Sequence, residues 1–343
     1  MKRAVEFIRN VKQKDDVIII FNNDGDGICS GVLVEKILHE ATGKRSYMIA
    51  QPMPPEKNLL RKIQSALPTK IILTDMAIDQ QPQVVKKLAS LSDVLILDHH
   101  QLKKNMTSSN IVHYNPRMDD PRVYQSTSYI AYKICSMIKD MKDSLWIAAV
   151  GMVADYDLTY SQDVVEEIRK QFDIQGKLYD SWIGRIADMI EAARSTKTYS
   201  CEQMMEIFLS AKNQEDILTN QTFLEAYKEV QNEIMVVLTD AETNSEITDR
   251  VMFYNIKSKY NLSSFISTRL SEMYENRLIV VYQKAGSRIK VSARCQKGMN
   301  VGKIMENATE GIGSGGGHEA AAGATFDVQG WEVFRQNVIK LVK

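Results

Sequence analysis

The feature that most constrains the fold of this chain is a set of three short apolar runs in its front half. The runs cover residues 17–21, 70–74 and 93–97 and are rich in β-branched residues, which is typical of strands buried on both faces. Apolar residues recur at helical spacing after the first run, and residues 83–91 also favour a helix. Strands that alternate with helices predict an α/β fold built on a parallel sheet with helices on both faces.

The pattern divides the chain into three parts. Since 343 residues exceed what one compact core usually spans, we expect two domains. We expect a larger α/β domain over residues 1–193, a helical linker over 194–243 and a smaller α/β domain over 244–343. In the smaller domain, strands and a helix lead to a Gly-rich turn, which a short strand near Ala324–Val328 and a final helix from Trp331 follow.

Charge is distributed unevenly along the chain. The whole chain is neutral, with 43 Lys and Arg against 43 Asp and Glu. Residues 250–343 hold 14 basic and 7 acidic residues, a net charge of +7, so residues 1–249 carry −7. The acidic part suits a cation site and the basic part suits a polyanion, with chance unevenness as the alternative.

Composition indicates a globular protein that is neither secreted nor membrane-bound. No apolar run is long enough to cross a bilayer, and the N-terminus lacks the apolar core of a signal peptide. We therefore expect a cytoplasmic protein without a membrane partner. The four cysteines lack the spacing of a zinc or redox motif and are expected as free thiols. They are Cys29, Cys135, Cys201 and Cys295.

Acidic and histidine side chains follow each of the three predicted strands. They are Asp24 and Asp26 after the first strand, Asp75 after the second, and Asp98, His99 and His100 after the third. Loops at the carboxyl ends of parallel strands converge on one edge, so we expect these side chains to lie together. Asp155, after the apolar helical run 148–154, is a further acid for the same place.

This many carboxylates would repel one another unless cations lay between them. Carboxylates with imidazole suit Mn²⁺ best, with Mg²⁺ or Zn²⁺ as alternatives. Two ions about 3.5–4 Å apart can share a carboxylate and stabilise the charge of a phosphoryl transition state. We expect Gly25 and Gly27 to let the backbone turn sharply, so that both adjacent aspartates face inward. Each motif alone also fits a surface turn or a helix cap, and only the combination predicts a site.

A second cluster lies in the basic part of the chain. Its residues are Gly315, Gly316, Gly317 and His318, followed by a run of Ala and Gly. A Gly run before a helix of small residues lets backbone N–H groups approach an anion, and His318 can donate to a phosphate or sugar. Arg294, at the end of a predicted strand, suits bidentate phosphate contact or base stacking. A flexible turn is the alternative for the Gly run.

Together these motifs resemble those of the DHH phosphoesterase superfamily. Its four motifs are similar to Asp24-Gly25-Asp26-Gly27, Asp75, Asp98-His99-His100 and Asp155. Its C-terminal DHH-associated domain is similar to residues 292–294 and 315–323, and Asn115-Pro116 also fits the family. Within the superfamily the chain is most similar to the compact RecJ-like single-strand exonucleases of archaea. The resemblance implies two lobes around a cleft, with two Mn²⁺ ions, or Mg²⁺, in the first lobe and the substrate held by the second.

The resemblance also implies roles for individual residues. Asp24 and Asp75 would hold one ion. The other ion would have the ligands Asp26, Asp75, His99 and Asp155. Asp98 would orient the two histidines, and His100 would contact the scissile phosphate. The nucleotide would be held by Arg294, Gly315, Gly316, Gly317 and His318. Asn22 departs from the family, because many relatives have His there, so we expect looser binding of the first ion.

Three functions are consistent with these motifs. The first is an exonuclease that hydrolyses single-stranded DNA or RNA to mononucleotides. The second is a phosphodiesterase for short oligonucleotides or cyclic dinucleotides, or a phosphatase for an adenosine bisphosphate. The third is a non-catalytic replication scaffold, which the complete set of acids and histidines disfavours. The resemblance also implies a GINS-type replication complex as a partner, whereas oligomeric state and strand polarity are left open.

Overall fold

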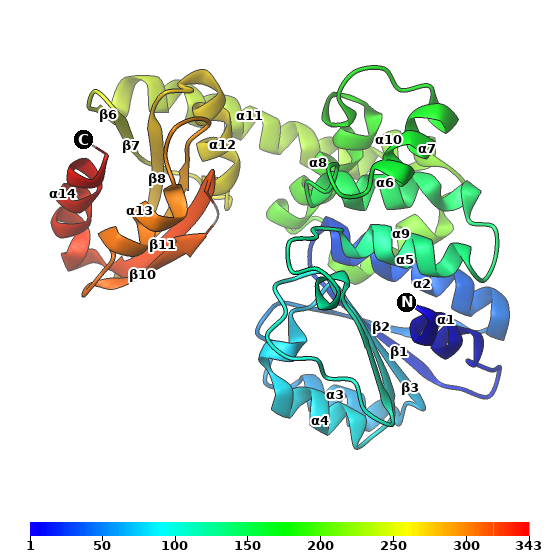
Figure 1. Ribbon diagram of the computed structural model, residues 1–343. Helices are drawn as coiled ribbons and strands as arrows, with labels where there is room; N and C mark the ends of the chain where they lie inside the picture. Colours follow the sequence, from blue (N-terminus) through cyan, green and yellow to red (C-terminus); the bar gives the residue numbers. More distant parts are fainter. Residues whose placement is uncertain (318, 343) are drawn as a thin grey trace. The chain divides into compact units, whose positions relative to one another are not determined.

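The computed structural model describes residues 1–317 and 319–342 and forms two compact units, Met1–Tyr227 and Lys228–Lys343. The first unit contains a five-stranded parallel sheet with the order β2-β1-β3-β4-β5 (Figure 1). Its strands are β1 (Val17–Asn22), β2 (Tyr47–Gln51), β3 (Lys70–Thr74), β4 (Asp93–Leu97) and β5 (Ile111–Tyr114). The strands predicted from the three apolar runs are therefore confirmed as β1, β3 and β4.

Helices supply the rest of this unit. They are α1 (Lys2–Arg9), α2 (Gly25–Thr42), α3 (Leu59–Ala66), α4 (Pro82–Ala89), α5 (Thr127–Ser136), α6 (Leu145–Ala154), α7 (Gln162–Phe172), α8 (Trp182–Thr196), α9 (Cys201–Ser210) and α10 (Gln214–Leu218). Helix α11 (Gln221–Asn244) begins in the first unit and continues into the second. Among the described residues, no helix has both the length and the apolar character that crossing a bilayer requires.

Alternate side chains of each strand enter two separate cores, one on each face of the sheet. Ile19 and Phe21 of β1 pack with α2, α5 and α6, whereas Ile18 and Ile20 pack with α3 and α4. Figure 1 shows α3 and α4 on one side of the sheet and α2 and α5 on the other. Because both faces are covered, the strands need continuous apolar runs rather than alternation.

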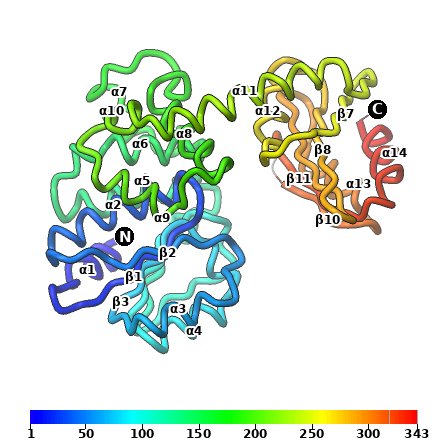
Figure 2. The backbone as a smooth tube through the Cα atoms, turned by 180° about the vertical axis from the view of Figure 1, so that it is seen from behind, coloured from blue at the N-terminus to red at the C-terminus, as the bar shows by residue number. Residues whose placement is uncertain are grey.

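The first unit extends past the boundary predicted at residue 193. Helix α9 packs against α2 (Figure 2), and Met204, Met205 and Phe208 are buried in the same core as β1. Ile217 of α10 joins that core as well. Residues 194–227, predicted as part of a helical linker, thus belong to the first unit because their apolar side chains complete its core.

The second unit contains a six-stranded mixed sheet with the order β10-β11-β9-β8-β7-β6. Its strands are β6 (Glu246–Ile247), β7 (Val251–Asn255), β8 (Leu278–Ala285), β9 (Arg288–Arg294), β10 (Gly313–Gly317) and β11 (Ala321–Asp327). Its other helices are α12 (Ser263–Met273), α13 (Val301–Ala308) and α14 (Trp331–Leu341). Only the β7–β8 pair is parallel among these paired strands. Helices α13 and α14 share a core with one face of the sheet, and α12 packs on β8 and β9.

The Gly-rich segment corrects a prediction, because it forms a strand rather than a turn before a helix. Strand β10 pairs antiparallel with β11, which begins at Ala321 in the run expected as a helix and includes most of the strand predicted near Ala324–Val328. A Cβ at Gly315 would lie 2.4 Å from the carbonyl oxygen of Met305 in α13. The missing side chain therefore serves close packing of β10 on α13, and no helix N-terminus lies at this position.

Candidate metal centre

The acids and histidines predicted from the strand ends lie at the carboxyl edge of the first sheet. Asp24 follows β1 as the N-cap of α2, Asp75 follows β3, and Asp98 follows β4. These strands are parallel neighbours, so their carboxyl ends meet at this edge. Asp75 has a φ of 61°, a left-handed conformation that is uncommon for residues other than glycine and that often marks a functional site.

Asp26 is fixed by the N-terminus of α5. The backbone N–H groups of Thr127 and Ser128 donate to its two carboxylate oxygens, each over 2.7 Å. The Thr127 hydroxyl also donates to Asp75 over 3.2 Å, so α5 holds two acids at once. Neither Thr127 nor Ser128 was predicted from the sequence, although Ser126-Thr127-Ser128 is a recognisable N-terminal signal for a helix.

His99 lies at the centre of the cluster. Its Nε2 is 3.2 Å from an oxygen of Asp75, and its Nδ1 is 3.5 Å from an oxygen of Asp155. Two groups of potential ligands share this histidine. They are Asp75, His99 and His100, and Asp26, His99 and Asp155, with ligand atoms within 4.8 Å of one another in each group.

Asp98 and His100 form a pair beside this cluster. The Nδ1 of His100 is 2.8 Å from a carboxylate oxygen of Asp98, and Asn115 donates to the backbone oxygen of His100 over 2.9 Å. Burial alone would lower the pKa of His100, but the hydrogen bond and charge of Asp98 outweigh it and raise that pKa to about 9. Asp98 therefore orients His100, while no hydrogen bond links it to His99 in the described residues.

Asp155 is held by a tyrosine that was not predicted from the sequence. The hydroxyl of Tyr124 donates to the Asp155 carboxylate over 2.8 Å, and the Tyr124 ring contacts that of His99 edge-on. Arg117 donates to the backbone oxygen of His99 over 2.8 Å and lies over the Tyr124 ring. No periodicity or motif marks Tyr124, since its role depends on tertiary contacts between distant segments.

Asp24 belongs to neither group of potential ligands but lies beside Asp75. One of its carboxylate oxygens accepts from the backbone N–H of Gly27 over 2.9 Å, and the other accepts from the side-chain amide of Asn22. The same amide donates to Asp75 over 3.3 Å. Asn22, which replaces the histidine of many relatives, thus links Asp24 to Asp75 through hydrogen bonds.

The two glycines of the first motif serve a different purpose from the predicted turn. Gly25 and Gly27 are the first and third residues of α2, and neither has a positive φ. A Cβ at Gly27 would lie 2.2 Å from the carbonyl oxygen of Asn22. The glycine therefore allows the start of α2 to pack against the end of β1, which brings Asp26 to the sheet edge.

The electrostatics of the cluster fit a divalent cation. Burial, together with the neighbouring acids, raises the pKa of Asp26 to about 7 and of Asp155 to about 8, and raises that of Asp75 well above its usual value. Burial lowers the pKa of His99 to about 3, so this imidazole is neutral and can act as a ligand. Its Nδ1 is buried without a hydrogen-bond partner. Crowded carboxylates and an unpartnered imidazole nitrogen are the donors that Mn²⁺ or Mg²⁺ would satisfy.

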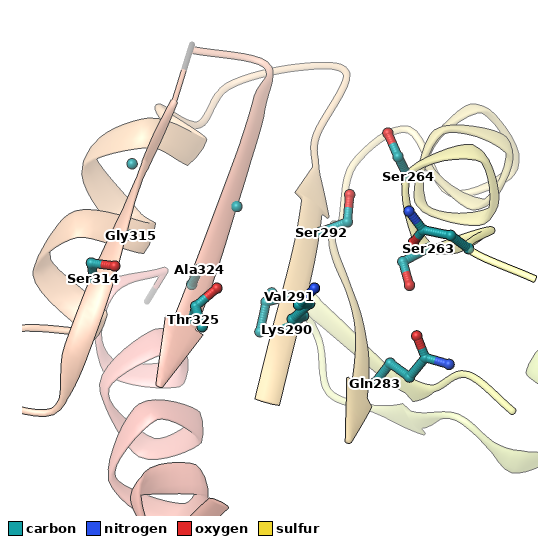
Figure 3. Close-up of a pocket in the computed structure, with 13 residues that line it drawn as sticks. Ser263, Ser264, Gln283, Lys290, Val291, Ser292, Ser314, Gly315, Ala324 and Thr325 are labelled. Carbon is teal, nitrogen blue, oxygen red and sulfur yellow. The ribbon is translucent and has the colours of Figure 1, made fainter. Parts of the chain in front are cut away.

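The second unit has a pocket of about 490 Å³ on the face of its sheet (Figure 3). Its lining combines hydroxyl, amide and ammonium groups with small and apolar residues, on adjacent strands and at the start of α12. The lining includes Ser263, Ser264, Gln283, Lys290, Ser292, Ser314, Gly315, Gly316, Gly323 and Thr325. Lys290 pairs with Gln283 and with Thr325 in the strand register, so these three side chains form a row across the sheet.

Only some of the residues predicted to bind the nucleotide line this pocket. Gly315 and Gly316 line the pocket, whereas Gly317 belongs to β10 outside the lining. Arg294 donates to the Ser264 hydroxyl over 2.9 Å and to the backbone oxygen of Ala293, so it supports the pocket wall. His318 lies outside the described residues.

Comparison with known families identifies both units. A model of the DHH family N-terminal domain matches residues 16–156, and a DHHA1 domain model matches residues 249–343. No curated protein matches the sequence significantly. The chain therefore belongs to the DHH family, with a DHH domain followed by a DHHA1 domain.

Solved structures with similar folds have low sequence identity to the chain. RecJ from Thermus thermophilus in complex with Mn²⁺ has a TM-score of 0.75 at 16% identity, over 98% of this chain and 53% of that one. A DHH domain described as a member of a family of ribosomal proteins has a TM-score of 0.76 at 17% identity, over 100% and 91%. A pGpG-specific phosphodiesterase from Vibrio cholerae has a TM-score of 0.53 at 14% identity, over 95% and 98%.

At these identities the similarity shows the fold, and the chain spans about half the length of the Thermus RecJ. The family match and the Asp and His cluster together define a DHH-family chain whose first unit holds a site suited to a divalent metal ion.

Proposed function

We propose that this chain is an exonuclease that hydrolyses single-stranded DNA or RNA to mononucleotides with the help of two Mn²⁺ ions. The observation that carries the proposal is the pair of ligand groups that share His99 at the carboxyl edge of the sheet. The second unit supports it, because its basic residues and its polar pocket suit a phosphate backbone.

The residues of the chain divide into holding and positioning roles. Asp26, Asp75, His99 and Asp155 would hold one ion, and Asp24 with Asp75 the other, as the family resemblance implies. Bound divalent ions would activate a water molecule and stabilise the charge that develops on the phosphate. Thr127 and Ser128 orient Asp26, and Tyr124 orients Asp155. His100 keeps 39% of its side chain exposed while Asp98 holds its Nδ1, so its ring is available to contact the scissile phosphate.

End-labelled strands of DNA and RNA test this function. We expect Mn²⁺-dependent release of labelled mononucleotides, and little activity in Asp75→Ala and His99→Ala. Asp93→Asn is a matched control, because Asp93 is the first residue of β4 and pairs with Lys70 away from the carboxyl edge. Full activity in the Asp75 and His99 variants, or no release by the unmodified chain, would refute the proposal.

A short-substrate phosphodiesterase is the second candidate. The pGpG-specific phosphodiesterase, a short-substrate enzyme by its description, has a similar fold over 95% of this chain. Both functions would use the same metal centre, and substrate length separates them. Activity that falls steeply beyond about five nucleotides would favour this second candidate, on the basis of binding-site size.

A further inference from the structure

Three exposed tyrosines lie next to the metal centre and take no part in the proposed metal binding. Tyr156, Tyr160 and Tyr179 are 69%, 48% and 38% exposed. Single exposed aromatic residues are ordinary on a protein surface. Here, however, the rings of Tyr156 and Tyr179 contact each other, with centroids 5.4 Å apart and planes inclined by 34°. Together they present an open aromatic surface, named here the tyrosine pair.

The tyrosine pair is fixed to the metal centre through the backbone. Tyr156 directly follows Asp155 and has a φ of 56°, a left-handed conformation that costs free energy for a residue with a side chain. Contacts of the two neighbouring residues hold Tyr156 in this backbone conformation. Asp155 is held by Tyr124, and the buried Asp157 accepts from the backbone N–H of Ser126 over 2.7 Å. Two acids that point inward thus leave the ring between them in solvent.

Tyr179 is anchored from the other side. It lies in a short 3-10 helix, Leu178–Asp180, whose Leu178 is buried in the core of the first unit. Its ring contacts the ring of Tyr156, which directly follows the candidate ligand Asp155, so Tyr179 lies close to the proposed metal centre. Two rings in contact beside the proposed metal centre thus offer apolar surface to a strand bound there.

We propose that the tyrosine pair stacks a nucleobase of the single strand whose backbone lies in the metal centre. Every base has an aromatic face, so such stacking tolerates any sequence. A tyrosine also exposes apolar surface at low cost in side-chain entropy. This proposal rests on the proposed function, because it assigns a base-binding subsite to that same centre.

The test compares intact strands with strands that lack bases near the labelled end. The variants are Tyr156→Leu, Tyr179→Leu and the double substitution, which keep apolar bulk but remove the aromatic face. Tyr47→Leu is the matched control, since Tyr47 is 56% exposed and begins β2 at the amino edge of the sheet. We expect the double variant to raise KM for intact strands about tenfold, with kcat nearly unchanged, and to leave the hydrolysis of abasic strands and the Tyr47→Leu control unaffected.

Other outcomes would overturn the proposal. An equal loss on intact and abasic strands would indicate a structural role for the two rings. Unchanged KM in the double variant would assign the rings to another use, such as a protein partner. If the unmodified chain hydrolyses no strand, the stacking proposal can still be tested by binding, measured as the fluorescence anisotropy of a labelled single strand in EDTA. We expect the double variant to bind this strand about tenfold more weakly. No loss of binding there would overturn the stacking proposal independently of the proposed function.

Discussion

The two sheets of this protein carry their candidate sites in different ways. In the first unit, side chains from loops after three strands converge on one edge and are buried acids and imidazoles. In the second unit, small and hydroxyl side chains stand side by side on the open face of neighbouring strands. The edge site, the Asp and His cluster at the carboxyl edge of the first sheet, depends on contacts between distant segments. The face site, the pocket on the second sheet, follows from strand register. The first suits cations and the second suits a phosphate or sugar surface.

The sharpest test of this contrast is Asp75→Asn, which alters the edge site alone. We expect hydrolysis to fall at least about 10³-fold, because Asp75 contacts His99 and is close to the other acids. Folding should be retained, since Asn has the shape of Asp, and burial and the neighbouring acids already disfavour ionisation of Asp75 when no metal is bound. Activity assays together with thermal unfolding in EDTA check both effects. Strand binding by the second unit's pocket should be unchanged, and its loss would mean that the two sites are not independent.

The pH dependence of metal binding gives the next largest effect. The raised pKa values of Asp26, about 7, and Asp155, about 8, lie above those of an unfolded aspartate. The stability that these groups contribute to the metal-free protein is therefore complete below about pH 4 and is lost as pH rises through 7 and 8. Metal must displace their protons, so with these two pKa values Mn²⁺ affinity should rise about 10³-fold from pH 6 to pH 9.

Calorimetric binding of Mn²⁺ at several pH values, with unfolding temperatures in EDTA, measures this linkage. The metal-free protein should lose stability over the interval in which the metal-bound protein gains it. A flat affinity would show that both carboxylates are already ionised in the metal-free state.

A smaller effect on Mn²⁺ affinity is expected when Asp157, which helps to position the ligands of the edge site, is replaced. Asp157 is buried, and its Oδ2 accepts from Ser126 N–H and from the Ser161 hydroxyl over 2.7 and 2.5 Å. Ser126 caps α5, whose next two residues hold Asp26. Asp157→Asn should lower Mn²⁺ affinity about tenfold, as is usual for groups that orient metal ligands.

Saturating Mn²⁺ should restore kcat in Asp157→Asn, because the ligands themselves are intact. Asp163→Asn serves as a control, since Asp163 contacts Tyr129 and Lys133 on the surface of the same unit. A kcat that stays low at high Mn²⁺ would mean that Asp157 contributes more than orientation.

How far the sequence predicts the fold depends on how each strand is buried. The strands β1, β3 and β4 lie inside the sheet and read as continuous apolar runs, which made them predictable. The edge strands β2 and β5 alternate between buried and partly exposed residues and are short, so they lack that signal. Helix α13, Val301–Ala308, was also not predicted.

The candidate site was predictable where it follows from topology and not where it follows from packing. Asp75 and His99 were found because parallel strands end at a common edge. Thr127 could not be found in this way, because it meets Asp26 across 101 positions of the chain. The Gly-rich strand was misread because residues without side chains show neither a helical nor a strand period.

The smallest expected effect tests the face site by itself. Lys290 lines the pocket of the second unit in the same row as Gln283 and Thr325 (Figure 3). If this row contacts a phosphate, Lys290→Gln should weaken single-strand binding about three- to fivefold and lower the slope of log affinity against log salt by about 0.7. Both the affinity and its salt dependence can be measured from the fluorescence anisotropy of a labelled strand in EDTA. The salt concentration is varied about fourfold, from roughly 50 to 200 mM.

Lys284 provides the matched control for Lys290, because it follows Gln283 on β8 and faces the opposite side of the strand. Lys284→Gln removes the same charge from the same unit without touching the pocket. An effect confined to Lys290 would assign the phosphate contact to the face of the sheet, and Mn²⁺ affinity should be unchanged in both variants. Equal effects from the two lysines would instead indicate that binding depends on the overall basic charge of residues 250–343 and not on the pocket.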